Sequence, residues 1–184
     1  MRDNKGNSSG ILKEILSWIT YIAGVLIVTW LIITFLGQRT VVIGESMQPT
    51  LSNGDNLIVD KISYRFRDPE RFDIIVFPQE EKGKHYIKRI IGMPGETVQI
   101  IGEDIYINGE ILEENYGAEP IENAYMAEDP ITLGEDEYFV LGDNRNHSAD
   151  SRQPDVGPIR RSEITGRAWV RIFPFNEFGV LKHK

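Results

Sequence analysis

The sequence predicts a mainly β protein, with an antiparallel folded sheet or barrel-like domain behind one N-terminal transmembrane helix. Three observations support this fold class. Residues 15–36 form an apolar run without a charged residue. The rest of the chain holds many short β-branched runs bounded by Gly, Asn, Asp or Pro, which is typical of strands joined by turns. No stretch beyond residue 36 shows a helical period.

The apolar run of residues 15–36 is long enough to cross a membrane, since a helix of that length extends roughly 33 Å. Trp18, Tyr21 and Trp30 are aromatic residues of the kind found at membrane interfaces. The alternative is a cleavable secretory signal, whose apolar core is usually about 7–15 residues long and ends in a small-x-small site. Residues 37–41 offer no such site. We therefore predict a retained anchor.

Charge divides the chain into three parts. Residues 1–14 carry a net charge of +1, and residues 37–184 carry a net charge of −9. Positive charge beside an anchor favours the cytoplasmic side. We therefore expect a cytoplasmic tail at 1–14, an anchor at 15–36 and an extracytoplasmic domain at 37–184, in a single-pass protein of the cell membrane.

Composition excludes several functions. The chain has 184 residues, 20 Lys and Arg against 28 Asp and Glu, and a net charge of −8, so nucleic acid is not an expected partner. Cysteine is absent, which excludes disulfides, a thiol nucleophile and thiolate zinc sites. With three histidines, a multi-histidine metal site is not expected either. We predict no metal and no cofactor.

The strands are expected in short segments along the outer domain. Asn108-Gly109 is the strongest hairpin signal, because this pair accepts the positive φ angles of a type I′ turn. The acidic segment 113–130 has no clear period and is interpreted as a surface loop or insertion. The predicted strands are 41–43, 56–60, 73–77, 86–91, 97–101, 105–107, 110–112, 137–141 and 167–172.

Residues 44–51, GESMQPTL, place a serine between Gly44 and Pro49 at the end of a predicted strand. Ser46 is therefore a candidate exposed nucleophile, and the alternative is an ordinary turn serine. It lies ten residues beyond the end of the predicted anchor. A fully extended chain of that length reaches at most roughly 35 Å, so Ser46 is expected to act close to the bilayer surface.

Residues 86–96, YIKRIIGMPGE, contain a lysine with apolar neighbours. Strand alternation puts Lys88 on the same face as Tyr86 and Ile90. Lysines in such places usually extend their amine to solvent. The alternative is a buried amine, whose pKa falls because burial disfavours the charged form. Such a neutral lysine accepts a proton from serine without any histidine.

Residues 142–152, GDNRNHSADSR, are dense in polar side chains and predict a hydrogen-bonded loop. A calcium loop is a poor match, because Arg145 and Ser148 occupy positions that need a ligand and a glycine. His147 raises the alternative of a Ser-His-Asp site. Asp150 and Arg152 are interpreted as an ion pair that shapes the loop, and such pairs contribute little when exposed.

The three segments in this order behind an anchor resemble the type I signal peptidases, in the single-anchor form of Gram-positive bacteria. The resemblance extends from the anchor to about Phe178. It implies that Ser46 is the nucleophile and Lys88 the general base, and that the hydroxyl of Ser148 helps to orient the lysine. It further implies a supporting charged network formed by Arg89, Asp143, Asp150 and Arg152.

The resemblance also implies a substrate cleft. Some relatives have a serine two residues before the nucleophile as an oxyanion donor, where this chain has Gly44. The segment 113–130 is short compared with the insertions of double-anchor relatives. The cleft residues implied are Ile43, Gly44, Glu45, Met47, Pro49, Tyr86 and Ile87.

These features predict a membrane-bound endopeptidase that removes signal peptides from secretory preproteins through an acyl-enzyme. Its expected partners are signal peptides, the lipid bilayer and the translocation channel. One alternative is a non-catalytic, membrane-anchored peptide-binding or assembly factor on the same fold. A self-cleaving Ser-Lys repressor would need a helix-turn-helix where this chain has its anchor.

Overall fold

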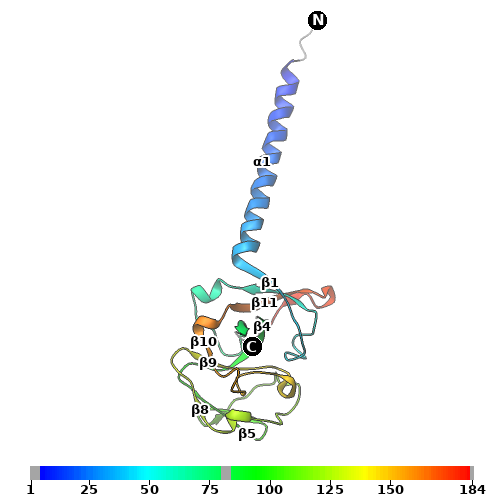
Figure 1. Ribbon diagram of the computed structural model, residues 1–184. Helices are drawn as coiled ribbons and strands as arrows, with labels where there is room; N and C mark the ends of the chain where they lie inside the picture. The colour runs from blue at the N-terminus through cyan, green and yellow to red at the C-terminus, as the bar shows by residue number, and fades with distance from the viewer. Residues whose placement is uncertain (1–4, 80–83, 183–184) are drawn as a thin grey trace. The chain divides into compact units, whose positions relative to one another are not determined.

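The computed structural model describes residues 5–79 and 84–182 (Figure 1), and the chain divides into two compact units after Gln38. The first unit contains one helix, α1 (Lys5–Leu36). Its stretch Gly10–Thr29 is long and apolar enough to cross a membrane, and none of it is buried by protein. The helix begins ten residues before the predicted apolar run, because nothing in residues 5–14 stops a helix from continuing.

The second unit is built from two sheets, and the strand pairings with a defined register are all antiparallel. The fold class predicted from the sequence is therefore confirmed. The larger sheet contains β1 (Gly37–Val41), β2 (Asn56–Asp60), β3 (Ile74–Gln79), β4 (Lys84–Gly92), β9 (Glu137–Leu141), β10 (Ile159–Arg160), β11 (Gly166–Phe173) and β12 (Gly179–Val180). Its order is β1-β2-β11-β3-β4-β9-β10, with β12 beside β11.

The smaller sheet has the order β7-β6-β5-β8. It contains β5 (Thr97–Ile101), β6 (Asp104–Ile107), β7 (Glu110–Ile111) and β8 (Ile131–Thr132). Within residues 39–79 and 84–182, the helical segments are short 3-10 turns, as the missing helical period predicts. They are η1 (Ser63–Arg65), η2 (Tyr125–Glu128), η3 (Arg145–His147), η4 (Arg161–Glu163) and η5 (Phe175–Glu177).

Both faces of the larger sheet are covered by apolar clusters. In β3, Ile74 and Val76 pack into one buried cluster, and Ile75 and Phe77 pack into another. This follows from the alternation of side chains along a strand. A strand buried on both faces has a continuous apolar sequence, which explains the run of Ile74 to Phe77. The smaller sheet has its own cluster around Val98 and Phe139.

The structure differs from the sequence prediction at the first and the shortest strands. The predicted strand 41–43 is wrong, because β1 ends at Val41. The Val42 N–H bonds to the Asp55 carbonyl at 2.8 Å, and Ile43 then turns outward and is 88% exposed. β8, β10 and β12 were missed, since each has two residues and shows no period. Segment 113–130 contains the short η2 and no strand, and Ile121 and Ala127 within it are buried.

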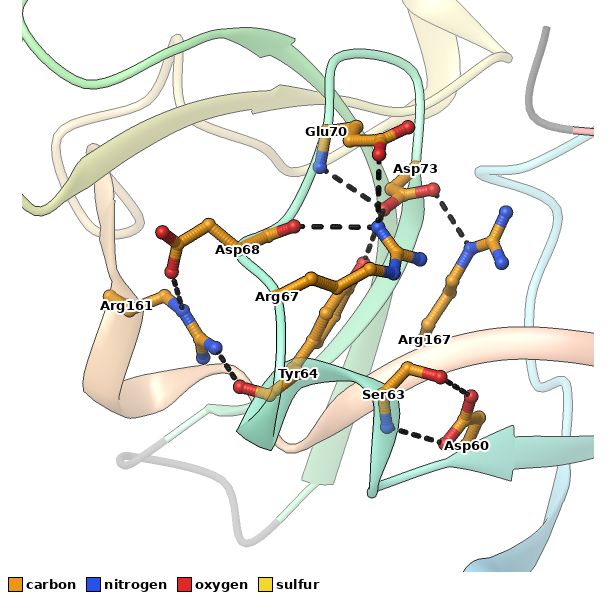
Figure 2. Close-up of polar contacts among 9 residues, drawn as sticks. All are labelled: Asp60, Ser63, Tyr64, Arg67, Asp68, Glu70, Asp73, Arg161 and Arg167. Carbon is orange, nitrogen blue, oxygen red and sulfur yellow. Dashed lines mark hydrogen bonds and ion pairs between the residues drawn. The ribbon is translucent and has the colours of Figure 1, made fainter.

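A polar cluster, here called the Tyr64 cluster, ties η1 to the larger sheet (Figure 2). The Tyr64 hydroxyl donates to Asp73 Oδ2 at 2.8 Å, and Arg167 Nε lies 2.8 Å from Asp73 Oδ1. Arg67 also pairs with Asp73, and the Arg161 guanidinium donates to the Tyr64 carbonyl. Burial raises the pKa of the Tyr64 phenol, so Tyr64 remains a hydrogen-bond donor.

Candidate active site

The candidate nucleophile and base come from two segments 42 residues apart. Ser46 lies in the turn that follows Val42, and Lys88 lies in β4, opposite Ile75 of β3. The turn begins at Gly44, whose φ of 97° is a conformation that side-chain-bearing residues rarely adopt. Lys88 Nζ and Ser46 Oγ are 2.8 Å apart, which is hydrogen-bond distance.

Lys88 is almost completely buried, with 2% of its surface exposed. Its amine also donates to the Ile87 carbonyl at 3.2 Å and lies 5.0 Å from the centre of the Tyr86 ring. Burial lowers the pKa of the Lys88 amine to about 8, while the carboxylates of Asp150 and Asp143 oppose this shift. The interpretation as a solvent-extended lysine is therefore wrong, and a neutral amine is accessible near physiological pH.

Two buried ion pairs stand beside this lysine. Arg89 Nε and Nη2 donate to the two oxygens of Asp143 at 2.8 and 2.7 Å. Arg152 Nε and Nη2 donate to the two oxygens of Asp150 at 2.8 and 3.0 Å. All four side chains are at most 1% exposed, so the expectation of a weak exposed pair at Asp150 is wrong. These four residues are called the site cluster below.

The loop of residues 142–152 packs directly on the serine turn. The Asn144 N–H donates to the Ser46 carbonyl at 3.0 Å, and the Asn144 side-chain amide donates to the Glu45 carbonyl at 3.2 Å. A side chain at Gly142 would collide with its surroundings, because a Cβ there would lie 2.4 Å from the Ser46 carbonyl oxygen. The glycine therefore permits the close approach of the loop to the nucleophile.

Two predicted residues of this loop have different outcomes. Ser148 is buried, but in the described part of the chain its Oγ has no hydrogen-bond partner, so its role toward Lys88 stays a prediction. His147 is exposed. Within residues 5–79 and 84–182 its side chain makes no hydrogen bond or ion pair, so the geometry does not support a Ser-His-Asp site.

A groove of about 620 Å³ opens beside the serine–lysine pair. Of the cleft residues predicted, the structure brings six to its walls, but Pro49 does not line it. The six are Ile43, Gly44, Glu45, Met47, Tyr86 and Ile87. Sequence reasoning missed the part of the wall formed by residues 40–42 and by Ala149. Residues 40–42 directly precede the predicted cleft residue Ile43, and this adjacency is the signal that could have found them.

Further residues of the polar network were also missed. The Thr50 hydroxyl donates to Asp143 Oδ2 at 2.5 Å, and Arg145 pairs with Glu114 at 2.9 Å. Thr50 lies inside the 44–51 segment and could have been singled out there, whereas Glu114 lies in an aperiodic segment and gave no signal. Among the described residues, no three His, Asp or Glu side chains gather as metal ligands.

A lysine amine held beside a serine hydroxyl, next to an open groove on an antiparallel sheet, is the arrangement expected of a serine peptidase with lysine in the place of histidine. Comparisons with known proteins agree with this class. The family model described as signal peptidase, peptidase S26, matches residues 15–173. The chain therefore belongs to the signal peptidase family, peptidase S26.

Relatives cover most of the chain. A probable signal peptidase I-2 of Synechocystis sp. is 44% identical over 154 residues, covering 80% of this chain and 68% of that protein. Signal peptidase I P of Bacillus subtilis subsp. natto is 38% identical over 171 residues, covering 89% and 92%. A crystal structure of a signal peptidase I from Enterococcus faecalis V583 is 38% identical, covers 55% of this chain and 97% of that chain, and has a TM-score of 0.46.

The family and these relatives confirm the resemblance to bacterial type I signal peptidases that the sequence motifs predict. The activity is the removal of signal peptides from preproteins by a serine peptidase. The long apolar helix α1 is consistent with the membrane anchor expected of such a protein.

Proposed function

We propose that Ser46 is the nucleophile and Lys88 the general base of this signal peptidase. The observation that carries the proposal is the 2.8 Å separation of Lys88 Nζ and Ser46 Oγ, on a lysine that burial favours in its neutral form. A general base works best when its pKa lies near the working pH, and a pKa of about 8 meets this condition.

The reaction proceeds through an acyl-enzyme. Neutral Lys88 takes the Ser46 proton as Oγ attacks the scissile carbonyl, and the resulting ammonium donates that proton to the leaving amine as the peptide bond breaks. Lys88 is then neutral again and takes a proton from water, whose oxygen attacks the ester. The proton passes back to Ser46 Oγ when the signal-peptide carboxylate leaves.

The oxyanion is stabilised first by the Ser46 backbone N–H. Within residues 5–79 and 84–182, this N–H makes no hydrogen bond, so it is free to donate to the substrate. The Gly44 N–H already donates to Asn53 Oδ1 at 3.0 Å, and glycine supplies no side-chain donor. One donor of this type contributes about 2.7–4 kcal/mol of transition-state stabilisation.

The substrate binds as an extended peptide along the groove. Strand addition supplies main-chain hydrogen bonds, and small pockets between side chains select the residues before the cut. The lining of the groove supports this proposal, because it includes residues 40–47 and 85–88 and the small side chain of Ala149. We infer small side chains at the first and third positions before the scissile bond.

The setting is the cell membrane, crossed once by α1 with the N-terminus in the cytoplasm. Support comes from the apolar stretch Gly10–Thr29 and from the net charge of +1 on residues 1–14. Ser46 follows the end of the helix by ten residues, so the lipid bilayer and the exit of the translocation channel are the expected neighbours of the reaction.

Mass spectrometry of a preprotein incubated with the full chain in detergent tests the dyad. We expect cleavage after a small-x-small site by the wild type, and none by Ser46→Ala or Lys88→Ala. Ser52→Ala and Lys61→Ala are matched controls outside the groove and should cut normally. If the wild type binds the preprotein but leaves it intact, the non-catalytic assembly factor is favoured. If Lys88→Ala cuts normally, the proposed base is wrong.

Orientation is tested separately by cysteine labelling. The chain has no cysteine, so Ser8→Cys and Lys182→Cys each create one reactive thiol, on either side of the apolar stretch Gly10–Thr29. In intact cells a membrane-impermeant maleimide should label the Lys182→Cys protein and leave the Ser8→Cys protein unlabelled. The reverse pattern would overturn the proposed orientation.

A further inference from the structure

The Arg89 guanidinium is almost completely buried, at the wall of a cavity of about 330 Å³ that Tyr116 also lines. Its Nε and Nη2 are taken by Asp143, and its Nη1 donates to the Phe72 carbonyl at 3.0 Å. The side chain is 1% exposed. A buried cation of this kind is costly unless its geometry and surroundings hold it firmly in place.

An aromatic pair covers one face of the guanidinium. The centre of the Tyr116 ring lies 3.7 Å from the Arg89 guanidinium carbon, which is cation–π contact. The Tyr116 ring in turn packs on the Phe72 ring, with centroids 5.0 Å apart. Phe72 has a φ of 70°, a strained conformation for a residue with a bulky side chain. The Phe72 backbone carbonyl thus accepts a hydrogen bond from Arg89, and the Phe72 ring packs on the Tyr116 ring that covers Arg89.

The segment that carries Tyr116 is fastened to the loop of residues 142–152. Glu114 pairs with Arg145, and its other carboxylate oxygen accepts the Tyr116 N–H at 2.9 Å. The Ala118 N–H donates to the Asp143 carbonyl at 3.1 Å. Two contacts therefore hold residues 114–118 against the loop that carries both site-cluster carboxylates, and the bond from the Tyr116 N–H to Glu114 fixes the shape of the segment itself.

We propose that Phe72 and Tyr116 are positioning residues of this peptidase, which keep water from the Arg89–Asp143 ion pair and thereby fix the charge that Lys88 faces. The inference rests on the proposed role of Lys88 as general base. It gives the acidic segment 113–130 a role in the reaction through Arg89, without any contact with substrate.

The charged groups around Lys88 determine how a substitution at Tyr116 would affect the protonation of the Lys88 amine. The loop of residues 142–152 contributes Asp143 and Asp150, each neutralised by its arginine. The serine turn contributes Glu45, which is exposed, and the groove rim holds His85 and His147. The β3 position opposite Lys88 is Ile75, which carries no charge.

Loss of the Tyr116 ring admits water to Arg89 and loosens its hold on Asp143. The Asp143 charge is then less well compensated, and the surroundings of Lys88 are less dry. Both changes favour the ammonium form and raise the pKa of Lys88. We expect the acidic limb of the kcat/KM profile to move upward by about 0.5 pH unit.

The test is the pH profile of preprotein cleavage by the full chain in detergent, for Tyr116→Leu, Tyr116→Phe and a matched control. Tyr116→Leu should shift the acidic limb upward and approach wild-type kcat/KM above pH 10. Tyr116→Phe retains the ring and should keep the wild-type limb. Tyr106→Leu makes the same change in β6, away from Arg89, and should also keep the wild-type limb.

The proposal would be overturned if the acidic limb of the kcat/KM profile of Tyr116→Leu lay at the wild-type pH. It would also be overturned if Tyr116→Phe shifted this limb as far as Tyr116→Leu does. Phe72→Leu removes the supporting ring and should shift the limb in the same direction by a smaller amount, which keeps the test open if Tyr116→Leu does not fold. Lys88→Ala is measured in parallel. If Lys88→Ala remains active, the assignment of Lys88 as general base is wrong. If Lys88→Ala is inactive and the acidic limb of Tyr116→Leu does not move, only the proposed role of Phe72 and Tyr116 is wrong.

Discussion

The site cluster and the Tyr64 cluster are both buried arrangements of aspartate with arginine, yet they differ in how dry they are. Both partners of each site-cluster pair are at most 1% exposed. In the Tyr64 cluster, Asp73 is buried, but Arg167 and Arg67 are 23% and 33% exposed. The first cluster encloses its cations, and the second leaves them partly in water.

This difference shows what each cluster contributes. Completely buried ion pairs are weak sources of stability, because desolvation offsets the attraction between the charges. The Tyr64 cluster instead connects η1, the residue that precedes β3, and β11 through a neutral phenol and partly exposed arginines, which suits a structural role (Figure 2). The site cluster faces Lys88, where fixed charge in dry surroundings acts on a titrating amine.

The largest expected effect is a loss of activity when the residue beside the site cluster is changed, but not when the Tyr64 cluster is changed. Lys88→Met keeps the length of the side chain but cannot take a proton, and we expect kcat/KM for preprotein cleavage to fall by about 10³-fold or more. Arg167→Met makes a comparable change in the Tyr64 cluster and should stay within about threefold of wild type. An equally large loss in Arg167→Met would contradict the division of roles.

The next effect is a pH-dependent stability that only Lys88 produces. Because its pKa is about 8 in the folded chain and 10.5 in the reference state, the unfolded chain binds more protons between these values. The unfolding free energy of wild type relative to Lys88→Met should therefore rise by about 3 kcal/mol from pH 8 to 10.5. Urea unfolding of both full chains in detergent measures the difference, and a flat difference would refute the buried neutral amine.

A smaller effect is expected when the phenol of the Tyr64 cluster is removed. Tyr64→Phe deletes the hydrogen bond to Asp73 and should lower the unfolding free energy by about 2 kcal/mol, the contribution of a bond to a charged group. The acidic limb of the activity profile should not move. A shifted limb would show that the two clusters are coupled.

The smallest effect is at the rim of the Tyr64 cluster. Asp68 pairs with Arg161 at 3.4 Å, but its side chain is 86% exposed. Solvent screens such pairs, so Asp68→Ala should change the unfolding free energy by less than about 0.5 kcal/mol. A change above about 1 kcal/mol would mean that the rim supports the cluster more than its exposure indicates.

Much of the fold could be predicted from local sequence. The strands 97–101 and 137–141 match the structure at both ends, because turn residues bound each run. β7 has two residues and was found from the Asn108-Gly109 turn before it, whereas β8, β10 and β12 have no such turn signal and are too short to show a period. The end of β1 was misplaced because the chain leaves the sheet at Ile43 to enter the serine turn, where Gly44 has a φ of 97°.

The site shows the same limit at the level of single side chains. Motif resemblance located Ser46, Lys88 and the site cluster, but alternation alone could not decide whether Lys88 was buried. That depends on the loop of residues 142–152, which is distant in sequence. Tyr116 had no signal at all, because its role follows from Arg89 and Phe72, which come near it only in the folded chain.

The close approach at Gly142 has a consequence for the synthesis of the chain. The contacts that complete the site join residues 42 to 99 positions apart, and one of the most distant is the approach of this glycine to the carbonyl of Ser46. The proposed dyad of Ser46 and Lys88 therefore acquires its packing against residues 142–152 only after most of the chain has been synthesised.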